Sequence, residues 1–118
     1  MISPLADIFR RQKKFISKWV DFDWLSKNYR YREKQVLGYI DHTIEELIEL
    51  RREMPIRKHW KSTRLDKPDI EKAKEEYIDV FHFVINLGIV LGFKDEKEIY
   101  DRYLSKHAIN KKRQKEKY

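Results

Sequence analysis

The stretch IEKAKEEYIDVFHFVINLGIVL, residues 70–91, decides the fold class. Its apolar residues recur mostly at spacings of three and four, which is the period of one buried face of an α-helix. The segment DKPD, residues 66–69, is typical of a helix start, and Gly92 suits the position just beyond a helix end. We therefore predict a long helix that ends at Leu91. The apolar positions that keep the spacing are Ile70, Ala73, Tyr77, Val80, Phe81, Val84 and Leu87.

Residues 34–54 predict a second long helix, because apolar side chains recur there at the same spacing. Pro55 ends this helix, since the proline ring removes a backbone donor and disfavours helical backbone in the residue before it. The basic segment 55–67 is then expected to be a loop that joins the two long helices.

Shorter helices are expected near both ends of the chain. The Ser-Pro pair at residues 3–4 is typical of a capping residue and a first helical position, and predicts a helix over about 4–19. Residues 20–33 hold aromatic side chains without a sustained period, so we expect a connection or a short helix there. Asp95 suits the cap of a last helix. Residues 106–118 either extend that helix or form an arm that becomes ordered on a ligand.

Composition indicates one small all-α domain. Of the 118 residues, 41% are hydrophobic and 40% are charged, which suffices for one core beneath a densely charged surface. The three Gly and three Pro disfavour a turn-rich β fold. We expect a bundle of four to five helices over residues 1–118, with a basic C-terminal arm over about 105–118. The absence of Cys excludes disulfides, thiolate zinc sites and a Cys nucleophile.

The net charge of +7 is concentrated at the C-terminal end. Seven of the 27 Lys and Arg residues lie between residues 102 and 118 against a single Glu, so the rest of the chain is nearly balanced. A small helical nucleic-acid-binding protein is therefore the alternative from a different class, although it gives the acidic residues no role. No uninterrupted apolar run has the length of a membrane-spanning helix, and charges interrupt the N-terminal segment too soon for a signal peptide. We expect a cytoplasmic protein that binds no membrane.

Two acidic pairs lie on the two predicted long helices. Glu46 and Glu49 are three residues apart and project from nearly the same helix face, and Glu76 and Asp79 repeat that spacing. Four carboxylates gathered in a partly buried bundle would repel one another, and their pKa values would rise unless a cation neutralised them. Mg²⁺, or Mn²⁺ in its place, takes oxygen ligands of this kind. A solvated charged face explains either pair alone, whereas both pairs together favour a metal site.

The order E-x-x-E, then E-x-x-D running into an apolar helix, resembles the all-α NTP pyrophosphatase superfamily, which includes MazG-type enzymes and dimeric dUTPases. The segment EELIELRREMPIRKHWK, residues 45–61, is similar to the dimeric dUTPase version, in which a Lys-x-Trp motif follows the first acidic pair. The tail of the chain resembles that family's closing pattern. The matching positions are Lys58 and Trp60 in the first motif and Tyr103, Lys106, Asn110, Arg113, Gln114 and Tyr118 in the tail.

The resemblance implies a homodimer that hydrolyses dUTP, or another nucleoside triphosphate, to the monophosphate and pyrophosphate. A metal-activated water would attack the substrate, with Glu46 and Glu49 as catalytic residues and Glu46 as the preferred base. The metal ligands would be Glu46, Glu49, Glu76 and Asp79.

The same resemblance assigns the substrate contacts. Lys58, Lys106 and Arg113 would bind phosphates as positive charges. Asn86 lies inside the apolar helix and is either a core amide or a group that reads the base. The candidate base or sugar contacts are Gln12, Trp60, Asn86, Asn110 and Tyr118.

Two positions depart from the family pattern. The family's first helix carries Gln-x-x-Leu-Asn, whose amides help to read uracil; Gln12 is present here, but Ile16 stands in place of the Asn. Lys117 stands in place of the Gly before the last Tyr. Selectivity for uracil is therefore open, and a MazG-like pyrophosphatase for another or a non-canonical nucleotide is the alternative within the class.

Overall fold

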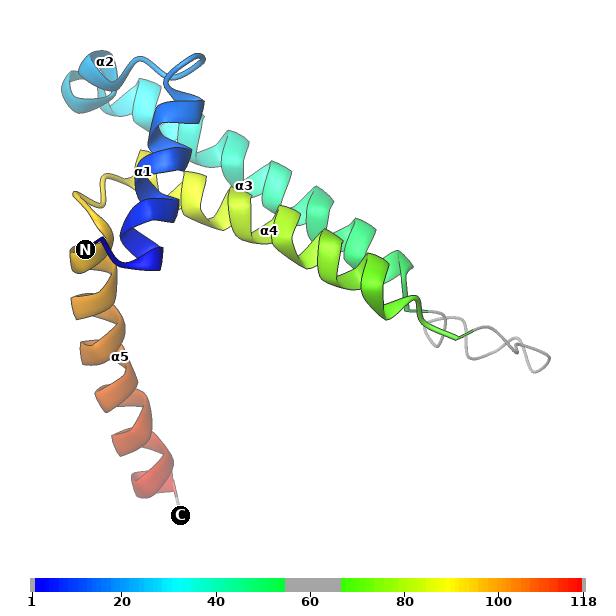
Figure 1. The fold of residues 1–118 in the computed structure, drawn as a ribbon. Coiled ribbons are helices and arrows are strands. Elements are labelled where there is room, and N and C mark those ends of the chain that lie inside the picture. The colour runs from blue at the N-terminus through cyan, green and yellow to red at the C-terminus, as the bar shows by residue number, and fades with distance from the viewer. Residues whose placement is uncertain (1, 55–66, 118) are drawn as a thin grey trace.

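The computed structural model describes residues 2–54 and 67–117 and places five α-helices in them (Figure 1). No strand occurs among these residues, so the all-α prediction is confirmed. The predicted basic loop lies outside the described residues apart from Lys67. The helices are α1 (Pro4–Ile16), α2 (Phe22–Lys27), α3 (Tyr29–Arg52), α4 (Ile70–Leu91) and α5 (Glu96–Lys117).

An antiparallel hairpin of α3 and α4 forms the long axis of the molecule (Figure 1). These two helices share the most extensive contact between any two elements of the described chain. In Figure 1, α1 crosses the hairpin near the C-terminal end of α4, and α2 lies beside the start of α3. The hairpin therefore carries the residues of both predicted acidic pairs on neighbouring helices.

The apolar core lies where α1 packs on the C-terminal half of α4, with α2 packed on the neighbouring α3. Ile16 and Val90 are the most deeply buried side chains there, at 1% and 0% exposed. In contrast, α3 contributes no fully buried residue in its whole length. The members of the buried cluster are Phe9, Ile16, Val20, Leu25, Ile85, Ile89 and Val90.

Side-chain caps explain where the helices begin. The hydroxyl of Ser3 accepts from the Ala6 N–H at 3.2 Å, and the carboxylate of Asp69 accepts from the Lys72 N–H at 3.0 Å. Asp95 accepts from the Glu98 N–H at 3.0 Å in the same way. The predicted starts of the first helix, of α4 and of the last helix are therefore confirmed.

Residues 17–33 differ in part from the sequence prediction. The first helix ends at Ile16 rather than near residue 19, and α3 begins at Tyr29 rather than at residue 34. The early start follows from the carboxamide of Asn28, which accepts from the Tyr31 N–H at 2.9 Å. The predicted short helix is α2, whose cap is Asp21.

The C-terminal segment extends the last helix, so α5 runs to Lys117 and leaves α4 at an angle of 98°. Gly92 makes this turn possible because its φ of 104° lies in the left-handed region that favours glycine. The guanidinium of Arg32 donates to the Val90 carbonyl at 2.9 Å and so ties α3 to the same turn. From Tyr100 to Glu116 every residue of α5 is exposed, and the helix projects from the body of the molecule (Figure 1).

Within the described residues, no single helix has both the length and the apolar composition needed to cross a membrane. Only α4 and α5 taken together meet those two criteria, as a bent pair.

Replacement of Gly92 by Ala is expected to lower the free energy of unfolding by about 1–2 kcal/mol, because an L side chain is strained at this φ. The added Cβ would also lie 2.6 Å from a guanidinium nitrogen of Arg32. Urea denaturation followed by circular dichroism measures the change. The matched control is Gly38→Ala in α3, where a Cβ meets nothing within 4 Å and helix propensity predicts a gain of about 0.5–1 kcal/mol. Equal stability of the two variants would contradict this account of the turn.

Candidate metal centre

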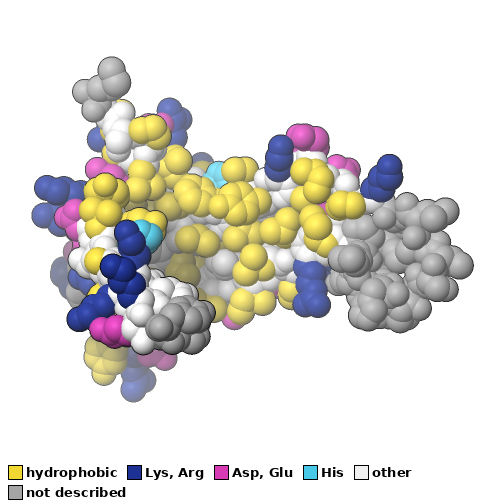
Figure 2. All heavy atoms as spheres, turned by 90° about the horizontal axis from the view of Figure 1, so that it is seen from below, with side chains coloured by type: hydrophobic (Ala, Val, Ile, Leu, Met, Phe, Trp, Pro, Cys, Tyr) yellow, Lys and Arg dark blue, Asp and Glu magenta, His cyan; other side chains and the backbone are white. Residues whose placement is uncertain are grey.

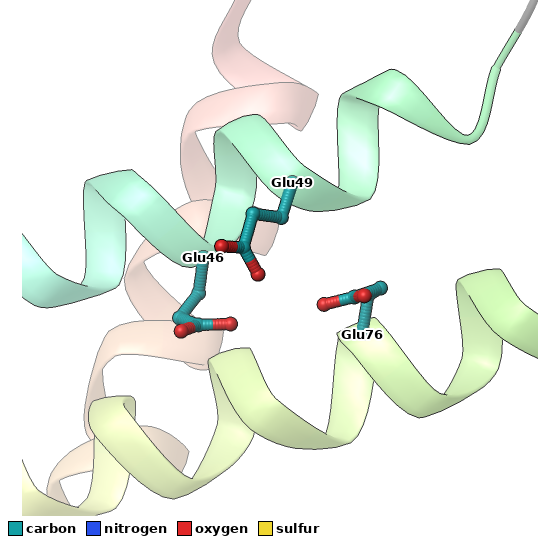
Figure 3. A group of neighbouring side chains, drawn as sticks. All are labelled: Glu46, Glu49 and Glu76. Atoms are coloured by element: carbon teal, nitrogen blue, oxygen red, sulfur yellow. The ribbon is translucent and has the colours of Figure 1, made fainter.

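Three carboxylates meet across the α3/α4 hairpin (Figure 3). Glu46 and Glu49 project from α3, and Glu76 projects toward them from α4. One oxygen from each residue lies within 4.8 Å of the others. The antiparallel packing of the hairpin thus brings together one predicted acidic pair and the first member of the other.

The fourth predicted ligand, Asp79, lies one helical turn beyond Glu76 on α4 and is exposed. It is not a member of the three-carboxylate group. Its charge is still close enough to help raise the pKa of both Glu46 and Glu76. Asp79 therefore borders the group, and its role as a ligand stays a prediction.

The group carries uncompensated negative charge. Burial, and then the neighbouring charge of Glu49, raise the pKa of Glu46 and of Glu76 above the usual glutamate range. The Oε2 atoms of these two residues are shielded from solvent and have no hydrogen-bond partner. No Lys or Arg of the described chain forms an ion pair with any of the three carboxylates.

Such a donor set fits a hard divalent cation. A shielded carboxylate oxygen without a partner costs free energy, which a cation would offset directly. All donors in the group are carboxylate oxygens, the ligand type that Mg²⁺ and Mn²⁺ prefer. The two oxygens without partners are therefore a structural reason, beyond the spacing in the sequence, to regard the group as a cation site.

An aromatic pocket of about 430 Å³ lies between α1, α3 and α4, and two of its lining residues lie one helical turn from the acidic pairs. His42 lies one turn before Glu46 on α3, and Phe83 lies one turn after Asp79 on α4. The rings of His42 and Phe83 stack, with centroids 5.3 Å apart and planes inclined by 21°. The pocket is lined by Phe15, Ile16, Trp19, Gln35, Gly38, Tyr39, His42, Phe83 and Asn86.

Two of the predicted base contacts meet at this pocket. The side-chain amide of Gln12 donates to the Oδ1 atom of Asn86 at 2.9 Å. Asn86 is only 5% exposed, and this bond leaves its own NH₂ group available as a donor. Ile16, which stands where the resemblance expects Asn, belongs to the apolar core and supplies an apolar section of the pocket lining.

The predicted phosphate contacts are not brought to the carboxylates within this chain. Lys106, Asn110 and Arg113 lie on the exposed length of α5, which points away from the hairpin (Figure 1). Lys58, Trp60 and Tyr118 lie outside the described residues. The carboxylate group and the basic helix are therefore separate features of one chain.

Sequence reasoning missed several residues that line the pocket, above all His42, Phe83 and Tyr39. Burial, with a smaller effect of Tyr31, raises the pKa of Tyr39, so its hydroxyl remains protonated at neutral pH. The sequence feature that could have indicated two of them is their spacing: His42 lies four residues before Glu46, and Phe83 lies four residues after Asp79. Each ring is therefore expected on the same helix face as the acidic pair.

A family model described as dUTPase matches residues 4–98 of the chain. The match spans α1 to α4 and includes the three carboxylates and every residue that lines the pocket. It ends before Lys106, Asn110 and Arg113. No curated protein and no solved structure matches the chain.

Without divalent cations, Glu76→Gln is expected to raise the thermal midpoint at pH 7, because it removes a carboxylate whose ionised form is less favourable in the folded chain than in the unfolded chain. The raised pKa means that the folded chain binds this proton more tightly than the unfolded chain, whose pKa stays near 4.5. Folded wild-type protein therefore loses stability as the pH rises from about 4.5 through the raised pKa, and the variant's advantage should vanish below that window. Thermal melts in EDTA across this pH range measure the effect.

The control for this experiment is Glu75→Gln, because Glu75 is an exposed neighbour outside the three-carboxylate group. It should melt as the wild type does throughout the pH range. A Glu76→Gln variant that melts below the wild type at pH 7 would contradict the repulsion inferred here.

Proposed function

The chain belongs to the dUTPase family, and on that premise we propose that it is a Mg²⁺-dependent pyrophosphatase that converts dUTP, or a related deoxynucleoside triphosphate, to the monophosphate and pyrophosphate. The proposal rests on the group of Glu46, Glu49 and Glu76, in which two shielded oxygens lack partners. The adjoining aromatic pocket supports it, since a nucleotide needs an apolar place for its base next to a cationic place for its phosphates.

Glu46, Glu49, Glu76 and Asp79 would hold Mg²⁺, or Mn²⁺ in its place. When bound, the cation would neutralise phosphate charge and lower the pKa of an attacking water. Three of these residues already have oxygens within 4.8 Å of one another. Asp79, which is exposed one turn along α4, would complete the set from the solvent side.

Glu46 is the preferred general base in this proposal. Burial and the neighbouring charge of Glu49 raise its pKa, and a carboxylate with a higher pKa is a better proton acceptor. Glu46 would take a proton from water as the water oxygen bonds to the α-phosphorus. The bond from that phosphorus to the bridging oxygen then breaks, and pyrophosphate leaves. Glu49 would position the attacking water and help to hold the cation.

The pocket would receive the base. His42 and Phe83 form a stacked pair of rings between the carboxylates and the pocket, where the sugar and base of a bound nucleotide would lie. The NH₂ group of Asn86, oriented by Gln12, would donate to a keto oxygen of the base. A pyrimidine with a keto group at this position fits better than one with an amino group, which supports dUTP over dCTP.

Lys58, Lys106 and Arg113 remain the proposed phosphate contacts, and Trp60, Asn110 and Tyr118 the proposed outer contacts to base or sugar. The functional unit would be a homodimer. A MazG-like preference for another nucleotide is the competing proposal within the class, because Ile16 offers no amide to the pocket. Relative kcat/KM values for dUTP, dTTP, dCTP and dATP decide between the two.

Wild-type protein is expected to release pyrophosphate from dUTP with Mg²⁺ and to stop when EDTA is added. Glu49→Gln and Glu76→Gln should each lower kcat by about 100-fold or more, since each removes a charge that positions the cation. A coupled pyrophosphate assay measures the rates, and Glu75→Gln, outside the group, should stay within about 2-fold of wild type. If the protein hydrolysed none of dUTP, dTTP, dCTP and dATP, the proposal would be wrong. If Glu49→Gln or Glu76→Gln kept wild-type turnover, the substituted residue would not belong to the site.

Asn86→Asp is expected to lower the kcat/KM for dUTP relative to dCTP by about 10- to 100-fold, because a donor in the pocket becomes an acceptor. The carboxylate can still accept from Gln12, so the bond between the two helices is retained. Circular dichroism melts check that the fold persists. An unchanged ratio would show that Asn86 is a core amide and does not read the base.

A further inference from the structure

A single glycine interrupts the side chains of α3. Hydrophobic side chains form a band along the hairpin of α3 and α4 (Figure 2), whereas Gly38, the one glycine of α3, lies in the interior of that helix. Glycine in a helix interior is destabilising relative to alanine. The φ of Gly38 is not positive, and a Cβ atom there would meet nothing within 4 Å. Neither backbone conformation nor packing within the described chain therefore requires a glycine at this position.

The space beside Gly38 belongs to the aromatic pocket. The α3 residues that line this pocket are Gln35, Gly38, Tyr39 and His42. Their spacings of three and four place them on one helix face, which continues to Glu46 and Glu49. The opposite wall is apolar where Phe15, Ile16 and Trp19 of α1 line it. A flat ring that enters between these walls can approach the backbone of α3 at Gly38, where no side chain intervenes.

The register of the hairpin places Asn86 in the same section of the pocket. The stacked rings of His42 and Phe83, 5.3 Å apart, mark where the two helices lie level. Because the helices run antiparallel, Gly38, one turn before His42, lies level with the turn of α4 that holds Asn86. Both residues line the pocket. The space at Gly38 and the polar group of Asn86 are therefore available to the same ligand.

Gln35 adds the hydrogen-bonding group that this section of the pocket otherwise lacks. The Oδ1 atom of Asn86 accepts from Gln12 at 2.9 Å, which leaves the NH₂ group of Asn86 as a donor. Gln35 is half-buried and its side chain forms no hydrogen bond within residues 2–54 and 67–117. Its carboxamide oxygen is an acceptor. A donor from Asn86 and an acceptor from Gln35 match a base edge in which a keto oxygen lies beside a ring N–H.

The spacing along α3 agrees with the shape of a nucleotide. Glu46 follows Gly38 by eight residues, which is about 12 Å along the helix axis. Gln35 lies about 4.5 Å further from the carboxylates than Gly38 does. In a pyrimidine nucleotide, the ring N–H and a keto group lie on the side of the ring away from the sugar. A base at Gly38 with its phosphates toward Glu46 therefore brings that edge toward Gln35.

We propose that Gly38 and Gln35 determine which base the pocket accepts. The ring lies flat against the bare backbone of α3 at Gly38. The carboxamide oxygen of Gln35 accepts from the ring N–H, and the NH₂ group of Asn86 donates to the neighbouring keto oxygen. The substrate class is then a nucleotide whose base has an N–H beside a keto oxygen, as uracil and thymine have and as cytosine and adenine do not. This inference rests on the proposed function in that it takes a nucleotide as the ligand.

Gly38→Ala should raise stability and weaken nucleotide binding at the same time, because its Cβ fills the space against which the ring packs. The probe is a dUTP analogue in which NH replaces the oxygen between the α- and β-phosphorus, so that binding is measured without cleavage. Titration calorimetry with Mg²⁺ should show about 10-fold weaker binding or more. A role confined to the fold would not move stability and affinity in opposite directions.

The matched control is Gly88→Ala, which adds the same methyl group inside α4 but outside the residues that line the pocket. Its Cβ would lie at ordinary distances of 3.6 Å from Phe93 and 3.9 Å from Ile99. This variant should bind the analogue as the wild type does. The inference is overturned if Gly38→Ala binds as tightly as Gly88→Ala, or if Gly38→Ala is less stable than the wild type.

Gln35→Met tests the second residue. It should lower the affinity for the dUTP analogue relative to the matching dCTP analogue by about 10-fold, because the ring N–H of uracil loses its acceptor. Lys34→Met, at an exposed neighbouring position outside the pocket, should leave the ratio unchanged. An unchanged ratio in Gln35→Met would overturn the assignment of Gln35.

These measurements separate failure of this inference from failure of the proposed function. If the wild type binds the dUTP analogue with the expected effects of the variants but hydrolyses no triphosphate, the proposed function is wrong and the inference holds. If the wild type hydrolyses dUTP but Gly38→Ala keeps the wild-type affinity, the inference alone is wrong. If the wild type does not bind the analogue, the inference is wrong whatever the turnover.

Discussion

The packing of α3 against α4 combines favourable apolar contacts with repulsion between like charges. The hairpin brings Glu46 and Glu49 of one helix within 4.8 Å of Glu76 of the other, and burial raises the electrostatic cost of ionising them. Apolar side chains on the same helices must outweigh that repulsion. The candidate site and the stability of the hairpin are therefore coupled: a cation that binds the carboxylates also relieves the main electrostatic repulsion in the hairpin.

The same packing creates the pocket. His42 and Phe83 come from the two helices of the hairpin, and their rings stack because α3 and α4 run antiparallel in this register. A slip of one helical turn would separate the rings and the carboxylates together. The chemistry of the site is thus distributed along one helix–helix contact, in which the aromatic rings lie one turn away from the carboxylates.

Local signals predicted the elements, whereas distant contacts fixed their arrangement. Asp69 and Gly92 delimit α4 as their residue types indicate, and the three-residue spacing of Glu46 and Glu49 predicted that these two carboxylates would lie on one face of α3. The direction of α5 could not be predicted from the sequence, because it depends on a hydrogen bond from Arg32 to the Val90 carbonyl, 58 residues away. The aromatic pocket could not be predicted from the sequence either, since residues of three helices form it.

The hydrogen bond between Gln12 and Asn86 joins positions 74 residues apart at the wall of the pocket. Because Asn86 is nearly inaccessible to water, loss of the Gln12 amide would leave the carboxamide oxygen of Asn86 without its partner. Substitutions at position 86 are therefore expected to keep a hydrogen-bond acceptor for as long as position 12 keeps its amide.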